Sequence, residues 1–242
     1  MTAPYTSGLF DDSVADIAAA YERLGHTLGW RFLNVSRAVL DAPVRIALIT
    51  INPGGNSIPV DHPAESCEDG ASYLVERWHN YPPGQATLQI QVQALFRMLA
   101  SEIGFIGTHS ELLEQSLISQ FVPFRSPRIA DLPRQSESLE FSRRLWARIL
   151  PIASPRLIIC LGRDVQRELR SLIPSAMGAT QIDVVSYPTG WGKYAAEIDQ
   201  FDRSGSVVRL LYLPHLSTWT LFTSKKCKQY IPAIIHAAAK DA

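Results

Sequence analysis

Three short segments of the sequence join an apolar run to polar residues that could do chemistry. They are Ile51-Asn52-Pro53-Gly54-Gly55, Ser119-Gln120-Phe121-Val122-Pro123-Phe124-Arg125 and Leu213-Pro214-His215-Leu216-Ser217-Thr218-Trp219. The amides of Asn52 and Gln120 each offer a donor and an acceptor, and a neutral His215 offers one of each. Each segment alone is more often a turn or a structural hydrogen bond, so the three carry weight only in combination.

The elements that must position these residues alternate between strands and helices. The apolar runs at 45–51, 116–123, 156–162, 182–186 and 207–213 predict strands. Spacings of three and four apolar residues predict helices over 11–28, 85–103, 139–150 and 226–240, with another beginning near Asp164. This alternation predicts a three-layer α/β/α fold with a central, mostly parallel sheet. One domain over residues 1–242 accounts for the whole chain.

The predicted topology also places the chemistry. Ligands of open parallel sheets bind beyond the carboxyl ends of the strands, where Asn52, Gln120 and His215 fall. The long polar stretch 56–84 follows the first of these ends, and we expect it to be either functional or an ordinary surface insertion. A shorter loop is predicted over 188–192.

Composition bounds the class of protein. The chain has 242 residues, is 46% hydrophobic and has no apolar run of the roughly 20 residues that span a bilayer. With no secretory signal at the start of the sequence, we expect a cytoplasmic protein without a membrane partner. The three cysteines are too few and too widely spaced for a four-thiolate metal site. We therefore expect neither a metal nor an organic cofactor.

The formal net charge is +0, but it is unevenly distributed along the chain. Residues 1–121 carry 6 Arg and no Lys against 13 acidic residues, whereas residues 122–242 carry 17 basic residues against 10 acidic ones. The basic side chains therefore cluster in the later segments. This clustering permits a positive face without demonstrating one.

In combination and in this order, the three segments resemble the uracil-DNA glycosylase superfamily. The Asn-Pro-Gly turn after the first strand and the histidine after the last strand are the specific part, and Asn52 is similar to the asparagine of the mismatch-specific and single-strand-selective branches. The chain departs from the family pattern at Thr50, where glycine is usual, at Leu216, and at Gln120, where an asparagine is expected. Branches with an iron–sulfur cluster need four cysteines.

The resemblance implies a uracil-DNA glycosylase-like fold and hydrolysis of the bond between the sugar and a deaminated base in DNA. Asn52 would position the water and His215 would stabilise the departing base. Gly54, Tyr73, Gln120 and Phe121 would contact the base. Tyr73 and Trp78 could each stack on it, and a core position is the alternative for both. The partner would be damaged DNA, bound by a monomer.

The residues after His215 are interpreted as the DNA-contacting segment. Leu216 or Trp219 would enter the base stack, beside Ser217, while phosphates would be held by Arg125, Lys225, Lys226 and Lys228. Three alternatives stay open: a purely structural set of residues, a non-catalytic nucleic-acid or nucleotide-binding protein, and a hydrolase of free nucleosides or nucleotides. His62 and His79 lack a paired ligand and are interpreted as loop residues.

Overall fold

A computed structural model describes residues 6–58 and 61–240, whose strands form one six-stranded sheet in the order β2-β1-β3-β6-β5-β4. The strands are β1 (Ile46–Thr50), β2 (Leu117–Gln120), β3 (Leu157–Leu161), β4 (Thr180–Trp191), β5 (Tyr194–Arg203) and β6 (Ser206–Leu213). β2, β1, β3 and β6 pair in parallel, whereas β5 is antiparallel to both β6 and β4. The prediction of a mostly parallel sheet is confirmed.

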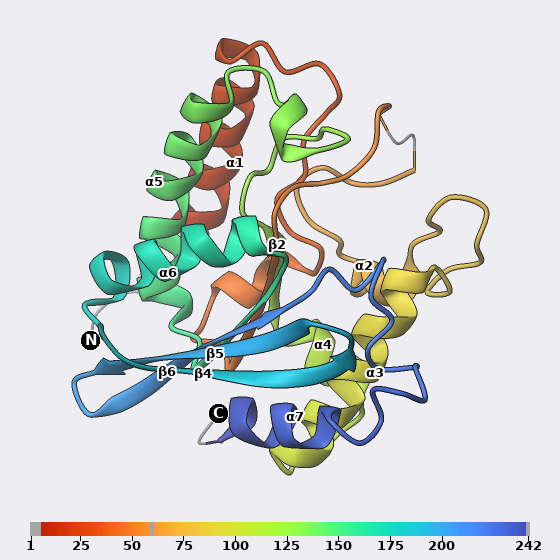
Figure 1. The fold of residues 1–242 in the computed structure, drawn as a ribbon. Coiled ribbons are helices and arrows are strands. Elements are labelled where there is room, and N and C mark those ends of the chain that lie inside the picture. The colour runs from red at the N-terminus through yellow and green to blue at the C-terminus, as the bar shows by residue number, and fades with distance from the viewer. Residues whose placement is uncertain (1–5, 59–60, 241–242) are drawn as a thin grey trace.

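Helices cover both faces of this sheet (Figure 1). On one face lie α1 (Thr6–Arg23), α5 (Gln135–Ala153) and α6 (Arg163–Met177), and on the other lie α3 (Thr87–Glu102), α4 (His109–Glu114) and α7 (Ile231–Ala239). The short helix α2 (Ser72–Val75) and the 3₁₀ turns Arg37–Leu40 and Ile129–Asp131 lie in connections. The three-layer α/β/α prediction is therefore confirmed.

The central strands β1 and β3 are apolar along their whole length because both of their faces are covered. All five residues of each strand are buried. Continuous β-branched and leucine runs are typical of such strands, which is why the sequence locates them. No helix in the described part of the chain is both long and apolar enough to cross a membrane.

The antiparallel half of the sheet differs from the prediction. β5 was not predicted at all, and β4 runs on through the segment expected as the 188–192 loop. β4 is an edge strand and β5 alternates polar with apolar residues, so neither has a continuous apolar run. Only residues 192 and 193 separate the two strands, which form a long hairpin.

Two helix boundaries also need correction. The first helix begins before residue 11 and ends at Arg23, because Gly25 adopts a left-handed conformation with φ of 72°. The last helix begins at Ile231 rather than at 226, and the preceding residues form turns. Pro232 stands in the first turn of α7, a position that proline favours.

Candidate functional site

The carboxyl ends of the four parallel strands lie side by side at one edge of the sheet. The pairing register places their last residues in one row, in the order Gln120, Thr50, Leu161 and Leu213. Asn52 and His215 each follow two residues beyond their strand. Asn52, Gln120 and His215 therefore leave the sheet at the same edge, as predicted. That they also converge on one pocket stays a prediction, because neither of the two depressions described below is lined by any of them. Because β3 separates β1 from β6, their ends are about 10 Å apart at the usual strand spacing.

Asn52 is fixed by two backbone carbonyl groups. Its Nδ2 donates to the carbonyl oxygen of Pro53 at 3.0 Å and to that of Ser126 at 2.9 Å. Both amide hydrogens are used in this way, so Oδ1 is the atom through which the half-buried side chain can engage water or a ligand. An amide oxygen can orient a water molecule, although it is too weak a base to take its proton.

His215 is held as a neutral ring with its proton on a defined nitrogen. The backbone N–H of Ser217 donates to Nδ1 at 3.4 Å, and the Ser217 hydroxyl lies 2.8 Å from the same nitrogen. A backbone N–H can only donate, so Nδ1 carries the lone pair and the proton sits on Nε2. Burial lowers the pKa of His215, which keeps the ring neutral at pH 7. Nε2–H is therefore the hydrogen-bond donor that His215 offers.

Gln120 ends β2 with only 8% of its surface exposed. Its Oε1 is buried and has no hydrogen-bond partner among the described residues. Leaving a buried acceptor unpaired costs about 1–3 kcal/mol, and a ligand N–H placed here would remove that cost. Because Oε1 is closed to solvent, Gln120 can accept a hydrogen bond from a ligand at this edge only after its side chain turns outward.

Three predicted ligand contacts are wrong. Leu216 and Phe121 are fully buried, and Tyr73 is 2% exposed. Phe121 stacks on Trp146 with a ring-centroid distance of 6.5 Å, and Leu216 belongs to the hydrophobic core. Tyr73 packs edge-on against Trp78, as the alternative core interpretation held. None of the three side chains has a free face with which to stack on a base or enter a base stack.

A buried ion pair closes the long loop that follows β1. Arg31 and Glu76 form a two-pronged pair with N···O distances of 3.0 and 2.6 Å, and both side chains are about 5% exposed. Glu76 also accepts from the indole N–H of Trp78 at 2.9 Å. His62 lies over the same carboxylate at 3.8 Å and contacts the Arg77 carbonyl, in agreement with its interpretation as a loop residue.

The glycine turn after Asn52 is braced by Arg125. The guanidinium of Arg125 donates to the carbonyl oxygen of Gly54, and its alkyl chain and NH1 approach Gly55. Gly55 has φ of 110°, a conformation that side chains disfavour. Burial, followed by the positive field of Arg31, lowers the pKa of Arg125. Arg125 therefore supports the turn; its contact with phosphate stays a prediction.

Sequence reasoning missed Arg163, which follows β3 between the ends of β1 and β6. Its guanidinium pairs with Glu197 at 2.6 Å and covers the ring of Tyr212 at 3.9 Å. The same carboxylate pairs with Arg170, which also holds the buried Asp199. An arginine at the first position of the helix after β3 was the available signal, but its acidic partners lie on β5, which was not predicted.

Trp219 is packed into a group of three rings that we call the aromatic cluster (Trp191, Tyr194 and Trp219). The Trp219 ring lies 4.0 Å from Tyr194 and 5.6 Å from Trp191, centroid to centroid. Lys226 places its ammonium 3.4 Å from the Trp191 ring. Lys225 and Lys228 are exposed beside it, and with Lys226 and Gln229 they line a depression of about 570 Å³. Trp219 is therefore not free to enter a base stack.

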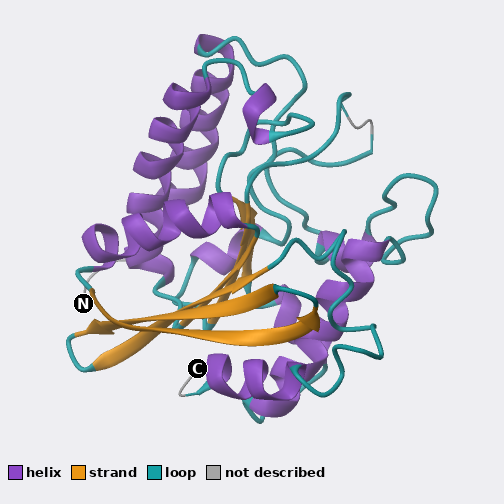
Figure 2. Cartoon of the chain, in the orientation of Figure 1, coloured by secondary structure: helices purple, strands orange, loops and turns teal. Residues whose placement is uncertain are grey.

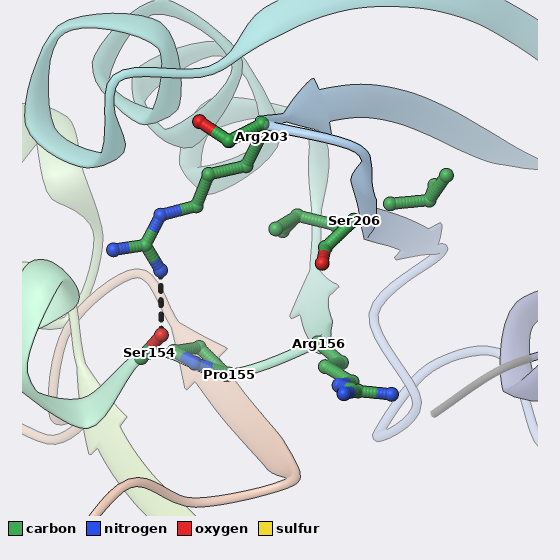
Figure 3. A pocket seen from close by; sticks show the side chains of 8 residues that line it. Ser154, Pro155, Arg156, Arg203 and Ser206 are labelled. Atoms are coloured by element: carbon green, nitrogen blue, oxygen red, sulfur yellow. Dashed lines mark hydrogen bonds between the residues drawn. The ribbon is translucent and has the colours of Figure 1, made fainter.

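A second depression lies far from these residues. It has a volume of about 330 Å³ and is lined by residues around Ser154, Arg156, Arg203 and Ser206, with Arg203 donating to the Ser154 hydroxyl at 2.5 Å (Figure 3). These residues lie where β3 and β6 begin, at the opposite edge of the sheet. The described residues hold no group of three or more metal-ligating side chains, and all three cysteines are buried thiols.

No protein-family model matches the chain, and neither does any curated protein. The geometry at the carboxyl edge of the sheet is therefore the basis for a functional proposal. Its parts are a fixed amide oxygen, an imidazole N–H donor and a buried amide acceptor, contributed by Asn52, His215 and Gln120 respectively.

Proposed function

We propose that the protein is a DNA glycosylase that hydrolyses the bond between the sugar and uracil, or another deaminated base, in DNA. The observation that carries the proposal is the neutral His215, whose Nε2–H donor stands at the same edge of the sheet as Asn52 and Gln120. A base that leaves its sugar takes the bonding electrons with it, and a fixed neutral donor stabilises that developing charge.

The three side chains fit the steps of this reaction. The bond between C1′ and the base nitrogen breaks, and the electron pair moves onto the base, where Nε2–H of His215 donates to its carbonyl oxygen. Water, oriented by Oδ1 of Asn52, forms the new C1′–O bond and releases its proton to solvent. Gln120 turns its Oε1, which has no partner among the described residues, toward the base and accepts from an N–H on the edge of the base. The target nucleotide must leave the duplex or already be single-stranded.

The sequence resemblance supports the same proposal through the same residues. The asparagine turn and the histidine segment that resemble the uracil-DNA glycosylase superfamily leave the sheet at one edge, on either side of β3. A superfamily fold is part of the proposal, as is DNA as the partner. The buried positions of Tyr73, Phe121 and Leu216 remove three contacts from it but none of the three reacting groups.

The test is excision from oligonucleotides that carry uracil, hypoxanthine, xanthine or hydroxymethyluracil, with alkaline cleavage of the abasic product. His215→Ala should lower turnover on the preferred base by roughly 10²–10³ because it removes one well-aimed donor. His236→Ala is the matched control, because His236 is an exposed histidine on α7 that pairs with Glu102.

Two outcomes would reject the proposal. One is no excision of any of the four bases by the wild-type protein, and binding without excision would then indicate a non-catalytic nucleic-acid-binding protein. The other is unchanged turnover in a folded His215→Ala variant, which would show that the reaction takes place elsewhere.

A further inference from the structure

The end of the β4–β5 hairpin lies against the segment that follows His215, and together they carry an unusual set of side chains. Figure 1 shows the end of the hairpin beside the blue segment after β6. The aromatic cluster joins the two: Trp191 and Tyr194 flank the hairpin turn, and Trp219 comes from the segment after β6. The backbone N–H of Trp219 donates to the carbonyl oxygen of His215 at 3.0 Å, so the cluster adjoins the proposed site.

Lysine is concentrated on this surface. The chain has 5 lysines, and four of them are Lys193 in the hairpin turn and Lys225, Lys226 and Lys228 in the segment after His215. The segments 184–196 and 203–240 contain no aspartate or glutamate. All four lysines are exposed. A surface that is rich in cations and poor in carboxylates favours a polyanion.

The three rings of the aromatic cluster differ in their exposure to solvent. Tyr194 is 37% exposed, whereas Trp191 and Trp219 are half-buried. The Trp191 ring also lies within 3.4 Å of the Lys226 ammonium. Tyr194 is therefore the most exposed ring of the cluster and the one nearest to solvent for a stacked base, and its ring lies 4.0 Å from that of Trp219, centroid to centroid.

Gly190 keeps the two segments together. It adopts φ of 79°, and a Cβ atom at this position would lie 2.5 Å from the carbonyl oxygen of Lys226 and 2.6 Å from the ring of Tyr230. The hairpin thus approaches the lysine segment as closely as a backbone without a side chain allows. Rings and lysines form one preassembled surface.

We propose that this surface binds single-stranded DNA next to the target nucleotide, with an unpaired base stacked on Tyr194 and the phosphates held by the four lysines. Stacking platforms set among cations are the usual means of binding unpaired strands, since every base has a flat face. A paired duplex offers no such face within its length, and Trp219 is packed too firmly to insert and create one. The proposed function explains why a strand should lie here, but the binding itself does not require excision.

The experiment measures binding of fluorescently labelled oligothymidine, a matched duplex and oligoribothymidine, which carries the same base on ribose, by anisotropy at several salt concentrations. Tyr194→Ala should weaken oligothymidine binding on the order of ten-fold and leave duplex binding unchanged, whereas Tyr194→Phe should bind like the wild type. Replacing Lys225, Lys226 and Lys228 with alanine should flatten the salt dependence of single-strand binding by up to about two units, from about 0.7 per phosphate contact. Thermal melting of each variant verifies that it is folded.

Lys240→Ala is the matched control for charge. Lys240 follows α7, and its carbonyl group contacts Arg209 near the start of β6, at the opposite edge of the sheet. Its replacement should not alter the salt dependence. The inference is overturned if Tyr194→Ala binds oligothymidine as the wild type does, if the duplex binds as tightly as the single strand, or if oligoribothymidine binds more tightly than oligothymidine. Because these oligonucleotides contain no damaged DNA base, a failure of excision rejects only the proposed function, and a failure here rejects only the strand surface.

Discussion

The loop after β1 and the segment after β6 leave the same edge of the sheet, and both carry aromatic side chains beside charged ones. In the loop after β1, Tyr73 and Trp78 are closed in by the buried pair of Arg31 and Glu76. In the segment after β6, Trp219 joins two rings of the hairpin at the surface, under lysines without acidic neighbours in sequence. Figure 2 shows both as long loops at one end of the sheet.

The difference between these two regions lies in how charge is neutralised. The Glu76 carboxylate pairs with the buried Arg31 guanidinium, so its loop packs against the protein and the ring of Tyr73 is buried in the core. Lysines without a carboxylate must stay in water, so the rings beside them remain partly exposed. The loop after β1 therefore acts as a support for the Asn52 turn, and the segment after β6 offers a binding surface.

The largest effect is expected from Glu76→Ala. This change leaves Arg31 buried without its counter-charge and removes the acceptor of the Trp78 indole, so the free energy of unfolding should fall by about 3–5 kcal/mol. Urea denaturation followed by fluorescence measures the loss. Replacing both partners, with Arg31→Met and Glu76→Leu, should recover much of the lost stability. A loss below 1 kcal/mol in Glu76→Ala would mean that the pair does not anchor the loop.

A pH-dependent loss of stability is expected from His26, whose ring stacks on that of Phe124 with a centroid distance of 4.1 Å. Burial, which disfavours the charged ring, lowers the pKa of His26 from 6.5 to about 4. Its Nε2 lies 3.0 Å from the Ser138 hydroxyl, and the buried Nδ1 has no partner among the described residues. The unfolded chain binds the proton more readily than the folded one. The stability that the buried, neutral His26 contributes is therefore complete above pH 6.5 and is lost as the pH falls toward 4.

The free energy of unfolding should fall by roughly 3 kcal/mol in all, because each unit of difference between the folded and unfolded pKa of His26 is worth 1.36 kcal/mol. Urea titrations at pH 7, 5.5 and 4.5 measure it. His26→Gln does not titrate in this range, so its unfolding free energy should vary less with pH than that of the wild type. Equal pH dependence in the two proteins would assign the effect to other groups.

Gly190→Ala should separate the hairpin from the lysine segment. The added Cβ atom would meet the Lys226 carbonyl and the Tyr230 ring, and alanine would have to hold φ near 79°. We expect a loss of about 2 kcal/mol in unfolding free energy. Gly192→Ala is the control, because Gly192 has φ of 58° but no atom within 4 Å of an added Cβ. Equal losses would show that backbone conformation alone, rather than close approach, explains the effect.

The smallest effect is expected from Lys226→Ala. The contact of its ammonium with the Trp191 ring is at the surface, where such contacts are worth about 0.5–1 kcal/mol. The thermal midpoint should fall by a few degrees at most. A loss as large as that of Glu76→Ala would contradict the division between a supporting loop and a binding surface.

Local patterns determined the parallel half of the fold. β1 and β3 are short apolar runs, α3 and α5 between them show spacings of three and four, and Asn52, Gln120 and His215 stand at or within two residues of strand ends. Their common edge follows because parallel strands all point the same way. Those features depend on residues close together in the sequence, so the sequence alone was sufficient to predict them.

Only the tertiary structure decided the rest. β5 has alternating polar residues whose acidic members pair with α6, so its pattern is intelligible only beside that helix. The burial of Tyr73, Phe121 and Leu216 depends on what packs over them from other segments. The aromatic cluster joins Trp191 to Trp219 across 28 residues of chain. Burial and ring contacts arise between segments far apart in sequence, and local residue patterns do not specify which distant segments meet.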